Sequence, residues 1–270
     1  MITAIKGLSP GLENLYKQYN NPKWLRPDPL AIVLEYRQPR DLELAALAAA
    51  ALALGNASLI EKAVLTALAP FGPKLSGSLY LLKDEEIREA SSGFIYRFFG
   101  ADDIAALLCA ARTVQKDHGS LENAFLDGHL ASEADYAMAA SRFVKLVQKA
   151  APWPFKPNLL PDPAKGSAAK RLFLYLRWMV RKDAIDPGPW ARADPALLLV
   201  PLDTHMASAC RRLGLLKRRS TDLKAAREAS AQFRLIRPDD PLRYDFCMTR
   251  PGIRPDLDPD KCFAPFIDTI

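Results

Sequence analysis

Two residues of this 270-residue chain, Lys170 and Asp203, have the types and local settings that covalent and electrostatic catalysis require. Lys170 follows a glycine that allows a tight turn, Gly166, and a candidate N-cap, Ser167, so we expect it in the first turn of a helix. A helix dipole disfavours a positive charge at that end, which suits a lysine that acts as a free-amine nucleophile. The alternatives are a lysine that binds phosphate and, if the loop is threaded differently, Lys165 as the nucleophile.

Asp203 stands at the start of another expected helix, after an apolar run that leads into Pro201. Aspartate is a common N-cap, so capping alone explains this position without any catalytic role. An ionised carboxylate at a helix N-terminus can also stabilise a developing cation and help proton transfer. The two roles are compatible, and the local sequence leaves both open.

The segment that contains both residues is strongly basic. Residues 165–219 carry 12 Lys and Arg against 4 Asp and Glu, a local net charge of +8, whereas the whole chain carries +6 with a pI near 9.1. This excess favours a polyanionic partner, DNA and RNA alike, and does not identify it. A solvated helical surface is the alternative. Arg177 and Arg181 share a predicted helix face with Lys170 and are candidate phosphate contacts, unless they only solvate the helix.

The elements that must position these residues are almost all helical, because apolar residues recur at helical spacing and Gly or Pro ends several segments. The predicted helices are residues 41–54, 58–68, 84–91, 101–116, 120–125, 133–149, 167–181, 204–213 and 221–233. The last of these has Ser220 or Thr221 as its expected N-cap. The chain after Pro238 is rich in Pro and Asp and is predicted to be irregular or in short turns.

The fold class that follows is all-α. Residues 151–162 contain four prolines and cannot form a regular helix, so we interpret them as the connection between two helical halves. The predicted organisation is a barrel-like helical lobe, residues 30–150, and a catalytic lobe, residues 151–270 together with residues 1–29.

The residues around Asp203 resemble a motif of a known superfamily. The stretch PLDTHMASACRRLGL, residues 201–215, is similar to the segment that carries the catalytic aspartate in helix-hairpin-helix (HhH-GPD) DNA glycosylases. The matching positions are Asp203, Thr204, His205, Arg212, Leu213 and Gly214. With KRL and LRWMVR in residues 170–181, the wider chain, from about Leu12 to Ile253, resembles a bacterial family of HhH-GPD-like proteins.

The resemblance implies a two-lobed glycosylase fold with an atypical hairpin, because LLPDPAKGSAAK, residues 159–170, replaces the usual LPGVG-type loop. Lys170 and Asp203 are 33 positions apart, which is longer than in endonuclease III-like members and similar to the archaeal 8-oxoguanine DNA glycosylases. The implied function is base excision repair by a DNA glycosylase and AP lyase, with 8-oxoguanine as the expected damaged base. The alternative is a glycosylase-like protein that binds nucleic acid without catalysis.

The resemblance also implies contacts to DNA and to the flipped base. Asn56, in a position that often probes the base, has helix C-capping as its alternative role. Residues 240–248 resemble a helix whose aspartate contacts the base in the archaeal group, which implies a base contact for Asp245, with Phe246 or Tyr244 as a stacking partner. A capped helix with core aromatics is the alternative. The other expected DNA contacts are Gly166, Ser167, Arg171, Arg177, Arg181, His205 and Arg212.

No cofactor is expected for this chain. The four cysteines form no CxxC pair and no C-terminal cluster, which argues against an iron–sulfur cluster, and the three histidines are too scattered for a metal site. The longest apolar run, residues 44–54, is too short to span a bilayer. The sequence therefore predicts a cytoplasmic monomer with reduced thiols that acts on DNA and not at a membrane.

Overall fold

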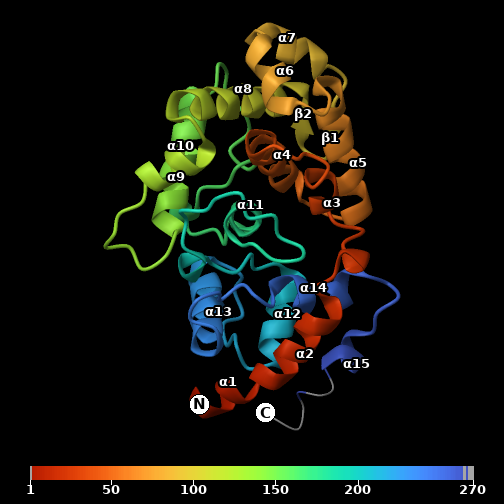
Figure 1. Ribbon diagram of the computed structural model, residues 1–270, viewed down its shortest axis with the longest axis vertical. Helices are drawn as coiled ribbons and strands as arrows, with labels where there is room; N and C mark the ends of the chain where they lie inside the picture. Colours follow the sequence, from red (N-terminus) through yellow and green to blue (C-terminus); the bar gives the residue numbers. More distant parts are fainter. Residues whose placement is uncertain (1, 264–265, 267–270) are drawn as a thin grey trace.

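Helix α11 (Lys170–Val180) runs through the middle of the protein, with other helices around it, in the computed structural model (Figure 1). The structure describes residues 2–263 and residue 266. Most of these are helical, and the single sheet among them is the antiparallel hairpin of β1 (Ile95–Tyr96) and β2 (Phe99–Gly100). The prediction of an all-α protein is confirmed at the level of class.

The helices above and beside α11 in Figure 1 come from the middle of the chain. They are α3 (Leu30–Val33), α4 (Pro39–Leu52), α5 (Ala57–Leu68), α6 (Leu75–Leu81), α7 (Asp84–Ala90), α8 (Ala101–His118), α9 (Leu121–Asp127) and α10 (Ala137–Ala150), with the 3₁₀ turn η2 (Ala69–Phe71). Helix α4 packs against α11 and is buried from Asp41 to Leu52. A helix buried on all sides needs apolar residues all round, which explains its run of Ala and Leu.

The helices below α11 combine both ends of the chain (Figure 1). They are α1 (Ile2–Gly7), α2 (Ser9–Tyr19), α12 (Thr204–Arg212), α13 (Leu223–Ile236), α14 (Asp245–Ile253) and α15 (Pro259–Phe263), and the remaining 3₁₀ turns are η1 (Pro22–Trp24), η3 (Pro163–Lys165) and η4 (Pro195–Leu197). Helix α1 packs against α13, and α14 packs against both α2 and α12. One hydrophobic core extends from this part into the helices around α4.

Helices α11 and α13 begin later than the sequence predicts, as does α10, which starts at Ala137 and not at residue 133. Helix α11 begins at Lys170 rather than at Ser167, because Gly166 (φ 86°) and Ala169 (φ 43°) are left-handed and interrupt the helix there. Helix α13 is capped by Asp222, whose side chain accepts a hydrogen bond from the Ala225 N–H, so the assignment of the cap to Ser220 or Thr221 is wrong.

The C-terminal part is more regular than the sequence suggests. Helix α14 lies within the Pro- and Asp-rich region after Pro238, where irregular chain is predicted, and it includes Pro251. The stretch 151–162 contains no helix, as its prolines require. None of the helices that the structure describes combines the length and apolar character needed to cross a membrane.

Candidate active site

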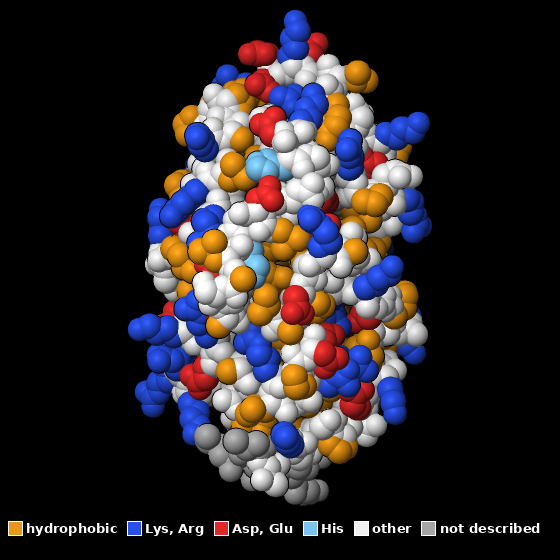
Figure 2. All heavy atoms as spheres, turned by 60° about the vertical axis from the view of Figure 1, so that its left-hand side comes forward, with side chains coloured by type: hydrophobic (Ala, Val, Ile, Leu, Met, Phe, Trp, Pro, Cys, Tyr) orange, Lys and Arg blue, Asp and Glu red, His pale blue; other side chains and the backbone are white. Residues whose placement is uncertain are grey.

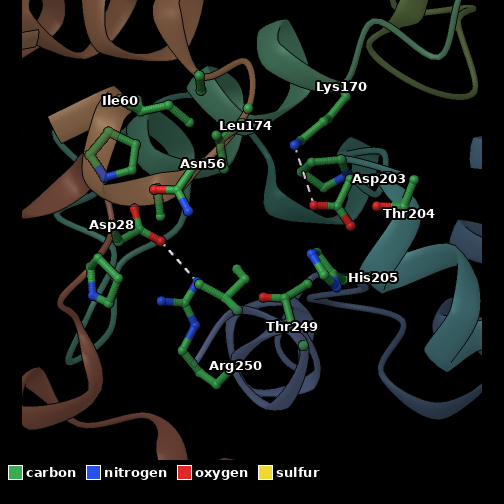
Figure 3. Close-up of a pocket in the computed structure, with 18 of the residues that line it drawn as sticks. Asp28, Asn56, Ile60, Lys170, Leu174, Asp203, Thr204, His205, Thr249 and Arg250 are labelled. Atoms are coloured by element: carbon green, nitrogen blue, oxygen red, sulfur yellow. Dashed lines mark hydrogen bonds and ion pairs between the residues drawn. The ribbon is translucent and has the colours of Figure 1, made fainter. Parts of the chain in front are cut away.

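A cavity of about 670 Å³ lies where α5, α11, α12 and α14 meet the loop before α3 (Figure 3). Its polar lining comes from segments far apart in the chain: Asp28, Asn56, Ser58, Lys170, Arg177, Asp203, Thr204, His205, Thr221, Asp245, Thr249 and Arg250. Apolar side chains, including those of Ile60 and Leu174, complete the wall. A concave site with apolar walls and a few convergent polar groups is the usual form of a small-molecule or base-binding pocket.

Lys170 enters the cavity because of how α11 begins. The left-handed residues Gly166 and Ala169 turn the chain immediately before the helix, and the Ser167 Oγ atom accepts a hydrogen bond from the Ala169 N–H at 3.1 Å. Lys170 is therefore the first residue of the helix, and its side chain remains 37% exposed. Leu172, Phe173 and the residues from Tyr175 to Val180 are buried, which anchors the helix behind the lysine.

Asp203 faces Lys170 from the start of α12. One carboxylate oxygen, Oδ1, accepts a hydrogen bond from the Met206 N–H at 2.7 Å and caps the helix. The other oxygen, Oδ2, lies 3.3 Å from the Lys170 Nζ atom (Figure 3). Capping and pairing with the lysine thus coexist, because each role uses a different oxygen. An amine beside a carboxylate has a proton acceptor within reach, which is the arrangement that nucleophilic lysine chemistry needs.

The turn before Lys170 is held by the chain that follows α12. Ser167 forms an isolated β-bridge with Asp222, and the Leu223 N–H donates to the Gly166 carbonyl oxygen at 3.1 Å. Neither Gly166 nor Ser167 lines the cavity, so these residues position Lys170 from outside it.

Asn56 lies in the cavity wall and caps a helix, but at the other end from the one predicted. Its Oδ1 atom accepts hydrogen bonds from the N–H groups of Ser58 at 3.0 Å and Leu59 at 3.4 Å, so it caps the N-terminus of α5. The C-capping alternative is therefore wrong. Figure 3 shows the Asn56 amide turned toward the interior of the cavity.

Two of the predicted phosphate contacts, Arg177 and Arg181, are buried instead, with exposures of 2% and 3%. Both arginines pair with Asp186, which is fully buried, and Arg177 also pairs with Asp245. Arg181 makes further ion pairs with Asp183 at 2.9 Å and Asp240 at 2.8 Å. With their guanidinium groups occupied by carboxylates inside the protein, neither arginine is available to DNA phosphates, and this expectation is wrong.

Asp245 reaches the cavity as part of the same ion-pair cluster. Burial raises the pKa of the Asp245 carboxyl, whereas the positive charge of Arg177 acts in the opposite direction. Its neighbour Phe246 is 1% exposed and lies against the guanidinium group of Arg250, 4.2 Å from the ring centre, rather than in the cavity lining. The expected base-stacking role of Phe246 is therefore not available in this arrangement.

The remaining predicted contacts divide between the cavity and the protein interior. His205 is exposed, lines the cavity and lies so close to Gly252 that a Cβ there would be 2.4 Å from its Nδ1 atom. Arg171 donates hydrogen bonds to the carbonyl oxygens of Ala51 and Asn158, which joins α11 to α4 and the proline-rich connection. It therefore has a structural role in place of the predicted DNA contact.

Arg212 lies outside the cavity, at the far end of α12. It pairs with Asp260 at 2.6 Å and lies 5.6 Å from the ring centre of Phe263. These contacts attach α15 to α12, so the arginine holds two helices together at the surface.

Asp28, Thr249 and Arg250 also line the cavity, and the sequence alone does not single them out. Arg250 donates a hydrogen bond from Nη2 to the Asp28 Oδ2 atom at 2.9 Å, and burial lowers the pKa of its guanidinium group. Thr249 follows Asp245 by one helical turn. A helix predicted for residues 245–253 would therefore have placed Thr249 beside Asp245 on the same face. Nothing local indicates Asp28, which is 222 positions from Arg250.

Comparison with known proteins gives one finding. No curated protein and no solved structure matches the chain. A family model described as "Protein of unknown function (DUF2400)" matches residues 28–254, which include every polar residue of the cavity. Since this match covers most of the chain, the protein belongs to the DUF2400 family.

Proposed function

We propose that this protein is a DNA repair glycosylase with AP lyase activity and a fold of the HhH-GPD type. The observation that carries the proposal is the 3.3 Å separation of the Lys170 Nζ and Asp203 Oδ2 atoms inside a cavity of about 670 Å³. The cavity lies within the size range of small-ligand pockets, so a single flipped base is a suitable occupant. The similarity of residues 201–215 to the glycosylase motif supports the same reading.

The reaction follows from the two side chains. Lys170, as a free amine, attacks the sugar C1′ atom, and the bond from C1′ to the base breaks with its electron pair on the base. The amine loses a proton to Asp203, and the base takes one up as it leaves. The carboxylate also stabilises the positive charge that develops on the sugar.

The lyase step begins from the lysine-bound sugar. Opening of the sugar ring transfers a proton to O4′ and leaves an imine between Nζ and C1′. Loss of a C2′ proton then breaks the C3′–O bond and cuts the strand by β-elimination. Water hydrolyses the imine and returns Lys170 to its free form.

DNA is a suitable partner because exposed cations flank the cavity. Lys165 lies just before the turn that carries Lys170, and Arg218 and Arg219 lie just before Thr221, which lines the cavity. Arg211 donates hydrogen bonds to the carbonyl oxygens of Arg218 at 3.1 Å and Arg219 at 2.9 Å and so supports this loop. Figure 2 shows Lys and Arg side chains gathered along the lower left edge of the visible face. Such groups bind the phosphate backbone without sequence preference.

A second candidate function is binding of distorted nucleic acid without catalysis. The observation that favours it is the atypical stretch before Lys170, residues 159–170, which replaces the hairpin loop that is usual in the glycosylases. The expected occupant of the cavity would then be bound and released unchanged. Turnover separates the two candidates, since a binder shows salt-dependent affinity and no product.

Borohydride trapping tests the proposal. The protein is incubated with duplexes that contain an abasic site or 8-oxoguanine, and borohydride reduces the imine to a stable covalent adduct. We expect the wild type to be trapped and Lys170→Gln not to be. Lys149→Gln is the matched control, because Lys149 is an exposed lysine of α10 outside the cavity, and its trapping should be unchanged. Trapping that persists in Lys170→Gln would show that Lys170 is not the nucleophile. Absence of wild-type trapping on both duplexes would overturn the proposed glycosylase and AP lyase activity.

A further inference from the structure

The imidazole of His205 differs from the other titratable groups of the cavity wall in having no partner within the described part of the chain. It is exposed, lines the cavity and forms no hydrogen bond or ion pair with any residue that the structure describes. The other titratable side chains of the wall each take part in an ion pair: Asp28, Lys170, Arg177, Asp203, Asp245 and Arg250. His205 is therefore the basic group of this wall that is free to act on a ligand.

Gly252 of α14 supports the His205 ring. Helix α12, which carries His205, packs against α14. A Cβ atom on Gly252 would lie 2.4 Å from Nδ1, 2.9 Å from Cγ and 3.2 Å from Cβ of His205, so this edge of the side chain rests on the bare backbone of α14. Glycine weakens a helix, and the close approach of the ring accounts for its presence here. The Nε2 atom lies farther from Gly252 than these three atoms and stays accessible.

The ring lies beside the pair formed by Lys170 and Asp203. His205 follows Asp203 by two residues, in the first turn of α12. In the view of Figure 3, the Asp203 side chain lies between the Lys170 amine and the His205 ring. When the sugar C1′ atom is bonded to the Lys170 Nζ atom, C2′ is one bond further on, inside the cavity that His205 lines.

The lyase step needs a base that the lysine and the aspartate do not supply. After the imine has formed, a proton must leave C2′, but the Lys170 Nζ atom is then bonded to C1′. Both oxygens of Asp203 are engaged as well, since Oδ1 accepts the Met206 N–H and Oδ2 lies beside Nζ. Histidine is the side chain that enzymes use most often for proton transfer, and His205 is within the same cavity.

We propose that His205 is the general base of the lyase step and that Gly252 is its positioning residue. The Nε2 atom accepts the C2′ proton, the C–H electron pair forms a double bond between C1′ and C2′, and the imine nitrogen becomes a neutral amine. That amine then re-forms the imine as a double bond forms between C2′ and C3′ and the C3′–O bond breaks, with its electron pair on the phosphate oxygen. The imidazolium releases its proton to water.

This inference rests on the proposed glycosylase and lyase function, and it assigns His205 a role in bond breaking beyond a contact to DNA. Two readouts on abasic-site DNA separate its step from the lysine chemistry. Borohydride trapping measures imine formation, and strand cleavage without borohydride measures the elimination that follows.

His205→Gln removes the base and keeps a polar side chain of similar length. We expect borohydride trapping to be kept, while the rate of strand cleavage falls about a hundredfold. His118→Gln, in α8 and outside the cavity, is the matched control and should leave both readouts unchanged. Strand cleavage by His205→Gln at the wild-type rate would overturn the proposal.

His205→Arg separates a base from a phosphate contact. Arginine carries a positive charge and five N–H donors but accepts no proton, so it can replace a histidine that only binds phosphate. We expect His205→Arg to cleave as slowly as His205→Gln. Cleavage restored to the wild-type rate would show that His205 contacts phosphate, and it would overturn the role as a base.

Gly252→Ala tests the positioning of the ring. The new methyl group displaces the imidazole, so strand cleavage should fall about tenfold or more while trapping is kept. The double variant with His205→Gln should cleave no more slowly than His205→Gln alone. Gly77→Ala, at a glycine of α6 whose Cβ would meet nothing closer than 3.9 Å, is the matched control and should keep cleavage. A further loss in the double variant would show that Gly252 does not act through His205.

The outcomes distinguish this inference from the function on which it rests. If the wild type is not trapped on abasic-site DNA, the glycosylase and lyase function fails, and the base fails with it. If the wild type is trapped and His205→Gln cleaves normally, only the base is overturned. Should His205→Gln lose trapping, His205→Asn is measured in the same assays, with thermal unfolding as the check on folding. Loss of trapping in a folded variant would place His205 before the elimination and overturn its role as the base.

Discussion

The Nζ atom of Lys170 lies 3.3 Å from the Oδ2 atom of Asp203, and each residue stands at the N-terminal end of a helix. The two helices meet at these ends, so a lysine and an aspartate that are 33 positions apart face one cavity. The other oxygen of Asp203 caps α12, which fixes the carboxylate relative to the backbone. The predictions below use this geometry and the interactions that support it.

Asp203→Asn separates the charge of the carboxylate from its capping role. Asparagine caps a helix about as well as aspartate, so we expect the free energy of unfolding to change by less than about 1 kcal/mol. Borohydride trapping should fall by about a hundredfold, because the carboxylate that accepts the proton is lost. Asp222→Asn, at the N-cap of α13, is the control and should keep trapping. Undiminished trapping in Asp203→Asn would remove the carboxylate from the mechanism.

Arg177→Met should destabilise the whole protein. The substitution leaves Asp186, which is fully buried, and Asp245 without one of their cationic partners. Breaking a buried ion pair from one side costs about 3 to 5 kcal/mol, which urea unfolding measures. Arg218→Met removes a surface ion pair with Glu228 and should cost less than about 1 kcal/mol. A similar small cost for Arg177→Met would mean that the buried cluster tolerates an unpaired charge.

Gly188→Ala tests the packing of the loop after α11. Gly188 has φ 51°, and a Cβ atom would lie 2.5 Å from the Arg181 carbonyl oxygen. Since backbone cannot move as easily as a side chain, we expect a loss of about 2 kcal/mol or more in the free energy of unfolding. Gly214→Ala is matched in backbone conformation (φ 69°) but has open space around its Cβ, so it should cost only about 1 kcal/mol. Equal losses of unfolding free energy for the two substitutions would show that the chain moves and relieves the contact between the new Cβ atom and the Arg181 carbonyl oxygen.

Glu13 should make the stability of the protein depend on pH. Arg243 donates two hydrogen bonds to its carboxylate, at 2.9 and 3.0 Å, and these lower the pKa of Glu13 below its ordinary value of 4.5, with burial acting in the opposite direction. A lowered folded-state pKa adds stability above pH 4.5, and this stability is lost as the pH falls through the folded-state value.

Glu13→Gln checks this dependence. Unfolding free energies of wild type and variant, measured from pH 7 downward, should differ by a constant amount at neutral pH and converge below about pH 4.5. Asp239→Asn, at an exposed surface pair with Arg237, should show no comparable convergence. A difference that stays constant down to low pH would contradict the role of the charge on Glu13.

The sequence alone determined those features that depend on local chemistry. The Ala- and Leu-rich stretch before Gly55 predicts a helix, because its residues favour helix and glycine commonly ends one, and α4 spans Pro39–Leu52. Asp203 is identified as a helix start because a short acceptor side chain in that position binds the free N–H groups of the first turn. The prolines of residues 151–162 exclude a helix for an equally local reason.

Tertiary packing decided which of the candidate residues share the cavity. Helical spacing places Arg177 and Arg181 on a face with Lys170, but only the approach of Asp186, Asp240 and Asp245 makes that face an interior ion-pair cluster rather than a phosphate-binding surface. Asp186 comes from the loop directly after α11, whereas Asp240 and Asp245 come from a segment about 60 positions away, so no pattern within the helix itself reveals them.

The same limit applies to the cavity itself. The 3.3 Å contact of Lys170 with Asp203 and the pairing of Arg250 with Asp28 join residues 33 and 222 positions apart. Hydrogen bonds and ion pairs act over a few ångströms in space, whereas helix propensities and caps act over a few residues in sequence. The sequence therefore determined the helical class and the candidate side chains that the predicted helices carry, and only their packing decided which side chains meet.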